Sequence, residues 1–169
     1  AKVPVRSTLK AAELQSLAEH FRQVPDYRQR IGRYPLFALL GITACAYLAS
    51  SPRGQKDLAG FARRLSSAQR AALGVRRTAA GEYPAPSQPT FSRLFDKVSP
   101  ERIEQALLDH QKQVRGTPPP DEIVVLDGKV PKHSGGLNVV TAGTAPGLYY
   151  LGSEVVAEKT NEIPAVRTL

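Results

Sequence analysis

The chain has 169 residues and a formal net charge of +8, with 23 Lys and Arg, 15 Asp and Glu, three His and a single cysteine. This length fits one domain, or two small ones, and is sufficient to bury a hydrophobic core. One cysteine and three scattered histidines exclude an internal disulfide framework and a zinc-type Cys/His cluster, and this cysteine usage predicts a reducing compartment.

The positive charge is concentrated in the first part of the chain. Residues 1–120 hold 19 Lys and Arg against 9 Asp and Glu, which gives +10, whereas residues 121–169 hold 4 against 6, which gives −2. A basic segment of this kind favours a polyanionic partner, and nucleic acid is the commonest one. A solvated basic surface without a partner is the alternative.

The first predicted helix is followed by the longest apolar run of the chain. Ser7 or Thr8 can cap this helix, which ends near Val24 because Pro25 follows. The apolar run at residues 36–49 has fourteen residues, fewer than the roughly 20 that cross a bilayer. The N-terminal residues contain no apolar signal core. We therefore expect a core helix, no membrane segment, and a cytoplasmic protein.

Two short helices are predicted next, at residues 57–65 and 67–73. Ser66 is placed to cap the second helix, and Gly74 stands just after its end. A polar loop follows.

The stretch PSQPTFSRLF, residues 86–95, is the candidate for a DNA-reading helix. Its first turn tolerates Pro89 after the cap. Because two short helices precede it, the arrangement is compatible with a helix-turn-helix, in which the N-terminal end of a recognition helix meets base edges and phosphates. The residues that would contact DNA are Ser87, the cap, and Gln88, Ser92 and Arg93. A short capped surface helix without DNA contact is the alternative.

The last predicted helix of this region starts at Ser99-Pro100 and ends before the prolines of GTPPPD. Beyond the prolines the apolar period changes to that of strands. The predicted strands are residues 123–126, 137–142 and 148–157, the last two joined by the turn GTAPG. Short connections between consecutive strands predict an antiparallel meander.

These elements predict an α+β chain with two domains. A basic helical domain, residues 1–116, is followed by a Pro-rich linker, residues 117–121, and by a strand domain, residues 122–169.

Asp127, in VVLDGKVPKHS, has two interpretations. A carboxylate at the end of a buried strand, beside a loop that leaves room for substrate, suits a metal ligand. Asp-Gly is equally a frequent turn pair, so Asp127 can be only the first residue of a turn. Residue chemistry alone favours the turn.

Four stretches carry a resemblance over nearly the whole chain: VPDYRQRIGRYPLFALLGITACAYL, PSQPTFSRLF, VVLDGKVPKHS and EKTNEIPAV. In their order and rough spacing the sequence resembles the DDE transposases of bacterial insertion sequences, specifically the ISAs-type or H-repeat-associated group. The resemblance implies that residues 122–157 are the first three strands of an RNase H-like fold. It also implies that Asp127 ends the first strand as the first of three acidic ligands for Mg²⁺ or Mn²⁺, and that the partner is double-stranded DNA at transposon ends.

The resemblance also places basic and polar residues near DNA. Lys129 and Lys132 would lie close to a phosphate path, while Lys159 and Asn161 would either cap the last helix or touch DNA. The chain departs from the family pattern because Val130 and Lys132 stand where Thr and Arg are usual.

The family pattern predicts that this chain is truncated, because the segments for the second Asp and the final Glu would lie beyond Leu169. Two-metal phosphoryl transfer needs several converging carboxylates, so we expect no strand cleavage or transfer and only weak Mg²⁺ binding by this chain. Glu162 could supply a second carboxylate. Alternatively, it stands at the start of the last predicted helix, where a negative charge interacts favourably with the positive end of the helix dipole. An unpaired apolar sheet edge predicts either a homodimer or a poorly protected C-terminal third.

Three functions therefore stay open. The first is a transposase-like, nucleoid-associated DNA-binding protein that is inactive alone. The second is a Mg²⁺-dependent nuclease that uses Asp127 and Glu162 or a second copy of the chain. The third is a non-enzymatic interaction module or a decayed gene product.

Overall fold

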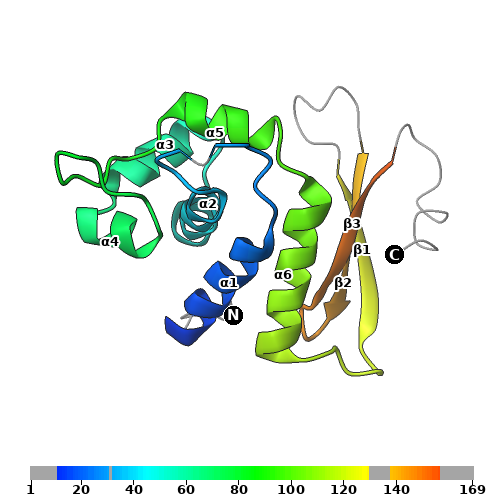
Figure 1. Ribbon diagram of the computed structural model, residues 1–169. Coiled ribbons are helices and arrows are strands. Elements are labelled where there is room, and N and C mark those ends of the chain that lie inside the picture. The colour runs from blue at the N-terminus through cyan, green and yellow to red at the C-terminus, as the bar shows by residue number, and fades with distance from the viewer. Residues whose placement is uncertain (1–10, 31, 130–137, 157–169) are drawn as a thin grey trace. The chain divides into compact units, whose positions relative to one another are not determined.

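The computed structural model describes residues 11–30, 32–129 and 138–156 (Figure 1). Within these residues, helices come first and strands follow, which confirms the predicted α+β class. The elements are α1 (Ala11–Gln23), α2 (Leu36–Ser50), α3 (Gln55–Arg64), α4 (Ser67–Ala72), α5 (Gln88–Phe95), α6 (Pro100–Arg115), β1 (Ile123–Lys129), β2 (Asn138–Ala145) and β3 (Tyr150–Val156).

The chain forms two compact units, Ala1–Leu107 and Leu108–Leu169. We refer to them as the helical unit and the sheet unit. The division falls inside α6, so the second half of this helix belongs to the sheet unit, whereas the linker predicted from the prolines lies between α6 and β1.

The core helix of the helical unit is α2. It carries no charged residue, and it packs against α1 and α3. An apolar helix without a polar face must be buried on several sides. Its buried residues are Leu36, Ala38, Leu39, Leu40, Gly41, Ile42 and Ala46. No single described helix is long and apolar enough to cross a membrane, and α2 and α3 pass that test only as a pair bent by 91°.

Three local signals read from the sequence are confirmed. Ser66 caps α4 in a reciprocal capping box with Gln69. Gly74, with φ +91°, supplies the left-handed residue after α4. The Oγ of Ser99 accepts a hydrogen bond from the backbone N–H of Arg102 at 3.2 Å, which caps α6.

The turn before α2 is held by a network that the sequence did not predict. The Asp26 carboxylate accepts two hydrogen bonds from the Arg28 guanidinium, at 2.7 and 2.8 Å, and one from the Leu36 backbone N–H at 3.3 Å. Asp26 thus caps α2, whose own N-cap residue, Pro35, has no side-chain hydrogen bond to offer. The hydrogen bonds from Arg28 hold the pKa of the Asp26 carboxyl below its usual value.

The sheet is the predicted antiparallel meander, with strand order β1-β2-β3. The turn between β2 and β3 differs from the prediction. β2 runs into the GTAPG stretch as far as Ala145, because Thr144 and Ala145 still pair with Val124 and Ile123. The connection is therefore residues 146–149.

One face of the sheet packs on the second half of α6. Its residues on β2, Val140, Ala142 and Thr144, are buried. The Gln111 side chain of α6 donates to the Tyr150 carbonyl and accepts from the Tyr150 N–H, both at 2.8 Å. These two bonds fix the helix to the start of β3.

β1 is an edge strand, and it is not the buried strand that its composition predicted. All seven of its residues are exposed, and the exposed fractions of its apolar side chains run from 38% at Leu126 to 71% at Ile123. An apolar run is therefore paired on one side only, with β2.

Candidate functional site

Asp127 lies inside β1, and both sequence interpretations of its backbone are wrong. β1 continues through Gly128 to Lys129, so Asp127 neither ends the strand nor opens a turn. It pairs with Thr141 of β2, which pairs with Ser153 of β3. Directly opposed residues point to the same face, so this row lies on the face opposite Val140 and its buried neighbours.

The Asp127 carboxylate is exposed and paired. Its Oδ2 lies 3.0 Å from the Nζ of Lys129, two residues along the same face, and the side chains are 62% and 76% exposed. An ion pair this open to water contributes little to stability. Both groups are therefore accessible to a solution partner.

The described residues do not fit a tightly bound Mg²⁺. They contain no group of three His, Cys, Asp or Glu side chains able to hold a metal ion. Glu154, the acidic residue of β3, pairs in the row of Val140 and so points to the other face from Asp127. One carboxylate leaves most of an octahedral shell to water, which gives weak binding.

Four predicted site residues lie outside the described residues: Lys132, Lys159, Asn161 and Glu162. Their predicted roles stay predictions.

The predicted DNA-reading residues lie on α5, which forms as expected. Ser87 is the N-cap, and its Oγ lies 3.1 Å from the Thr90 Oγ1 instead of bonding a backbone N–H. Ser87 and Gln88 are exposed, and Ser92 is partly exposed. The N-terminal end of α5 therefore presents hydroxyl and amide groups to solvent.

Arg93 stands in the last turn of α5. It is exposed, and its Nε donates to the Pro89 carbonyl at 3.1 Å, which holds the side chain back along the helix toward the N-terminus. The Arg93 carbonyl accepts from the Tyr27 hydroxyl at 3.1 Å. Phe91 and Leu94 are fully buried on the opposite side of α5 and anchor it in the core.

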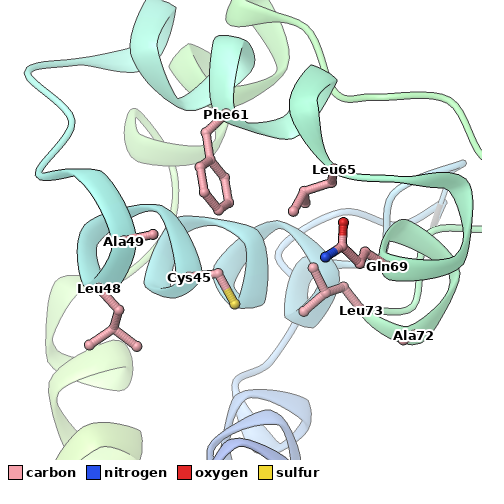
Figure 2. Close-up of a pocket in the computed structure, with 8 residues that line it drawn as sticks. All are labelled: Cys45, Leu48, Ala49, Phe61, Leu65, Gln69, Ala72 and Leu73. Atoms are coloured by element: carbon pink, nitrogen blue, oxygen red, sulfur yellow. The ribbon is translucent and has the colours of Figure 1, made fainter. Parts of the chain in front are cut away.

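The helical unit also has an apolar hollow of about 430 Å³ between α2, α3 and α4 (Figure 2). Its lining is hydrocarbon except for the Gln69 amide and the Cys45 thiol. Gln69 already accepts a hydrogen bond from Ser66, and burial raises the pKa of the Cys45 thiol, which disfavours the reactive thiolate. The hollow offers no acid, base or nucleophile.

The cations of α3 were not predicted as site residues from the sequence. Lys56, Arg63 and Arg64 are exposed, and their i, i+7, i+8 spacing was the signal that could have found them.

Comparison with known proteins shows what the sequence is similar to. Residues 18–111 match the family described as DDE_Tnp_1-associated. Two relatives from Escherichia coli (strain K12) are the "H repeat-associated putative transposase YhhI", 26% identical, and the "H repeat-associated putative transposase YbfD", 24% identical, each aligned over 93% of this chain. The chain spans 42% and 62% of their respective lengths. No solved structure matches the chain.

Proposed function

The chain belongs to the DDE_Tnp_1-associated family, and we propose that it acts as the duplex-DNA-binding part of a transposase-like protein. The observation that carries the proposal is the exposed N-terminal end of α5 on a strongly basic unit. Ala1–Leu107 holds 17 Lys and Arg against 8 Asp and Glu, a surplus of nine positive charges. Such a surplus attracts the phosphate backbone and steers association.

α5 serves as the reading helix of a helix-turn-helix-like arrangement with α3 and α4. Its residues Ser87, Gln88, Ser92 and Arg93 have the matching chemistry. An amide can form paired hydrogen bonds with adenine, an arginine with guanine, and serine hydroxyls with bases or phosphates. Phe91 and Leu94, buried at 0% exposure, keep the helix fixed while its polar side stays open.

The sheet unit corresponds, in this proposal, to the first three strands of an RNase H-like domain. The antiparallel order β1-β2-β3 along the chain supports this assignment. Asp127 is then the first acidic residue of the DDE set, and Lys129, already 3.0 Å from it, turns to a DNA phosphate when DNA is bound. Lys132, Lys159 and Asn161 are proposed to line the same path.

The 169-residue polypeptide itself is proposed to bind DNA without cutting it. Asp127 has no second carboxylate on its face of the described sheet, and a Mg²⁺-dependent displacement needs several. A second copy of the chain, paired along the exposed β1 edge, is the proposed partner that would bring two such faces together.

Sequence-selected duplexes test the role of α5. Gln88→Ala and Arg93→Gln should reduce the preference for the selected sequence over random duplex by about 1–3 kcal/mol each, while binding to random duplex changes little for Gln88→Ala. Asp96→Asn, an exposed change just beyond α5, is the matched control. Equal loss on selected and random duplexes for Gln88→Ala would remove α5 from base reading.

A further inference from the structure

α3 gathers three cations on one helix face that the account above does not use. Lys56, Gly60, Arg63 and Arg64 recur at i, i+4, i+7 and i+8, so they share a side of the helix. The three cations are exposed, whereas Leu58, Ala59 and Ala62 on the other side are buried. We call these four residues the α3 basic face.

The face is hollowed rather than flat. A cavity of about 290 Å³ is lined by Ser50, Pro52, Lys56, Asp57, Gly60, Arg63 and Arg64. Gly60 lies midway between the cations, and a side chain added there would meet the guanidinium of Arg64 at 3.6 Å. The absence of a side chain at Gly60 therefore lets the guanidinium groups of Arg63 and Arg64 lie against the helix beside this cavity.

The positive charge of this face is not neutralised within the described part of the chain. Neither the ion pair of Arg28 with Asp26 nor that of Lys129 with Asp127 involves a residue of this face. Asp57 lines the same cavity, but its Oδ2 accepts the Arg53 backbone N–H at 3.0 Å. The lining keeps two positive charges in excess.

Helix stability does not account for the arrangement. Arg63 and Arg64 stand in the last turn of α3, where the helix dipole favours cations. Lys56 stands in the first turn, where the dipole disfavours one. A cation kept at the unfavourable end, beside two others, points to an anionic ligand.

We propose that the α3 basic face binds consecutive phosphates of a DNA duplex, independently of base sequence. The seven residue steps from Lys56 to Arg63 rise about 10.5 Å along the helix, which spans about three base steps at 3.4 Å each. Arginine pairs with phosphate through two hydrogen bonds, and lysine acts as a point charge. This inference rests on the proposed DNA binding and adds a surface to it.

The packing of the helical unit supports a joint role with α5. α3 and α5 pack against each other inside this unit. In a helix-turn-helix the reading helix enters the groove while an earlier helix contacts the backbone. α3 then fixes position on the duplex, and α5 reads the sequence.

A salt titration with random duplex DNA tests the proposal. The double variant Lys56→Gln/Arg63→Gln should reduce the slope of log K against log salt by about 2 and weaken binding at least about tenfold near 0.1 M salt. The loss should be equal on selected and random sequences. The melting temperature should stay unchanged, because both side chains are exposed.

Two control variants separate the outcomes. Lys56→Arg/Arg63→Lys keeps the charge and should keep the slope. Arg30→Gln/Arg33→Gln removes the same charge from exposed residues outside the α3 basic face and should leave the slope unchanged. Equal loss in this second control would overturn the inference, because net charge alone would then explain the effect.

Failure of this inference differs from failure of the proposed function. If the unmodified chain binds duplex with a steep salt slope and Lys56→Gln/Arg63→Gln keeps that slope, only the α3 basic face is rejected. If the unmodified chain shows no salt-dependent binding, the proposed function fails. Variant-sensitive binding to phosphatidylserine vesicles, with DNA binding unaffected, would assign the face to a membrane surface instead and overturn the proposal.

Discussion

The helical unit and the sheet unit differ in how far their apolar side chains are exposed to solvent. In the helical unit, Leu39, Ile42 and Phe91 are at most 1% exposed, whereas in the sheet unit Ile123, Val124 and Val125 of β1 are 49–71% exposed. The first unit closes its own core, whereas in the described residues of the second the apolar strand β1 pairs on one side only and stays exposed. An apolar sequence run therefore indicates burial only when other elements supply the covering surface.

The family match falls mostly on the unit that closes its core. It covers residues 18–111, while Asp127 lies beyond it. The helical unit is therefore the part of the chain to test for DNA binding. The sheet unit is the part to test for stabilisation by a partner chain.

The largest expected effect is the loss of a core aromatic ring from the helical unit. Phe91→Ala removes a fully buried ring from α5 and should lower the free energy of unfolding by about 3–5 kcal/mol. Phe95→Ala, on the same helix but 39% exposed, is the matched control and should cost less than about 1 kcal/mol. Chemical denaturation measures both, and similar losses would contradict the assignment of the core.

The second largest effect is expected at the Asp26 cap of α2. Asp26→Asn should lower the free energy of unfolding by about 1.5–3 kcal/mol at pH 7, because it removes the charge-assisted hydrogen bonds from Arg28 and the cap of α2. The lowered pKa of Asp26 sets the pH dependence: its contribution is fully present above the unfolded value of 3.8 and is lost as pH falls through the lower folded value. The gap between parent and variant should therefore close below about pH 4. A gap that persists there would show that ionisation of Asp26 is not its source.

Two glycines of the helical unit should respond to alanine with opposite signs. Gly74 has φ +91°, and an added Cβ would overlap the Phe37 ring, so Gly74→Ala should cost at least about 1 kcal/mol. Gly60 lies inside α3 with ordinary space around it, so Gly60→Ala should stabilise by about 0.5–1 kcal/mol. Thermal melts measure both, and a destabilising Gly60→Ala would contradict the described packing of α3.

The smallest expected effect is on β1. Val125→Thr replaces a side chain that is 49% exposed and should change the free energy of unfolding by less than about 0.5 kcal/mol at low protein concentration. Thr141→Val, on the paired strand, keeps the strand propensity and serves as the control. A loss that grows with protein concentration would show that a second chain covers β1.

Much of the helical unit could be predicted because its signals are local. The uninterrupted apolar run of α2, the Ser66 cap and Gly74 each specify structure within a few residues. The Asp26 cap of α2 could not be predicted, because Asp26 and the Leu36 N–H that it accepts from are ten positions apart and the stretch VPDYRQRIGRYP indicates only a basic, turn-rich connection.

The sheet unit was less predictable because pairing decides its boundaries. Asp127-Gly128 is a turn dipeptide by composition, yet here it continues β1, since Thr141 and Val140 of β2 supply its partners. The residue type of the candidate site could be named from the sequence and the resemblance. Its exposure and the ion pair with Lys129 could not.

The most direct test of the central claim is a titration of labelled duplex DNA with the 169-residue chain, from about 50 to 200 mM salt, with and without Mg²⁺, followed by a gel for strand scission. The account predicts saturable binding that weakens steeply with salt, does not require Mg²⁺, and leaves the strands intact. Binding that is absent or independent of salt would contradict the DNA-binding claim. Mg²⁺-dependent scission that Asp127→Asn abolishes would contradict the claim that Asp127 lacks the carboxylate partners for catalysis.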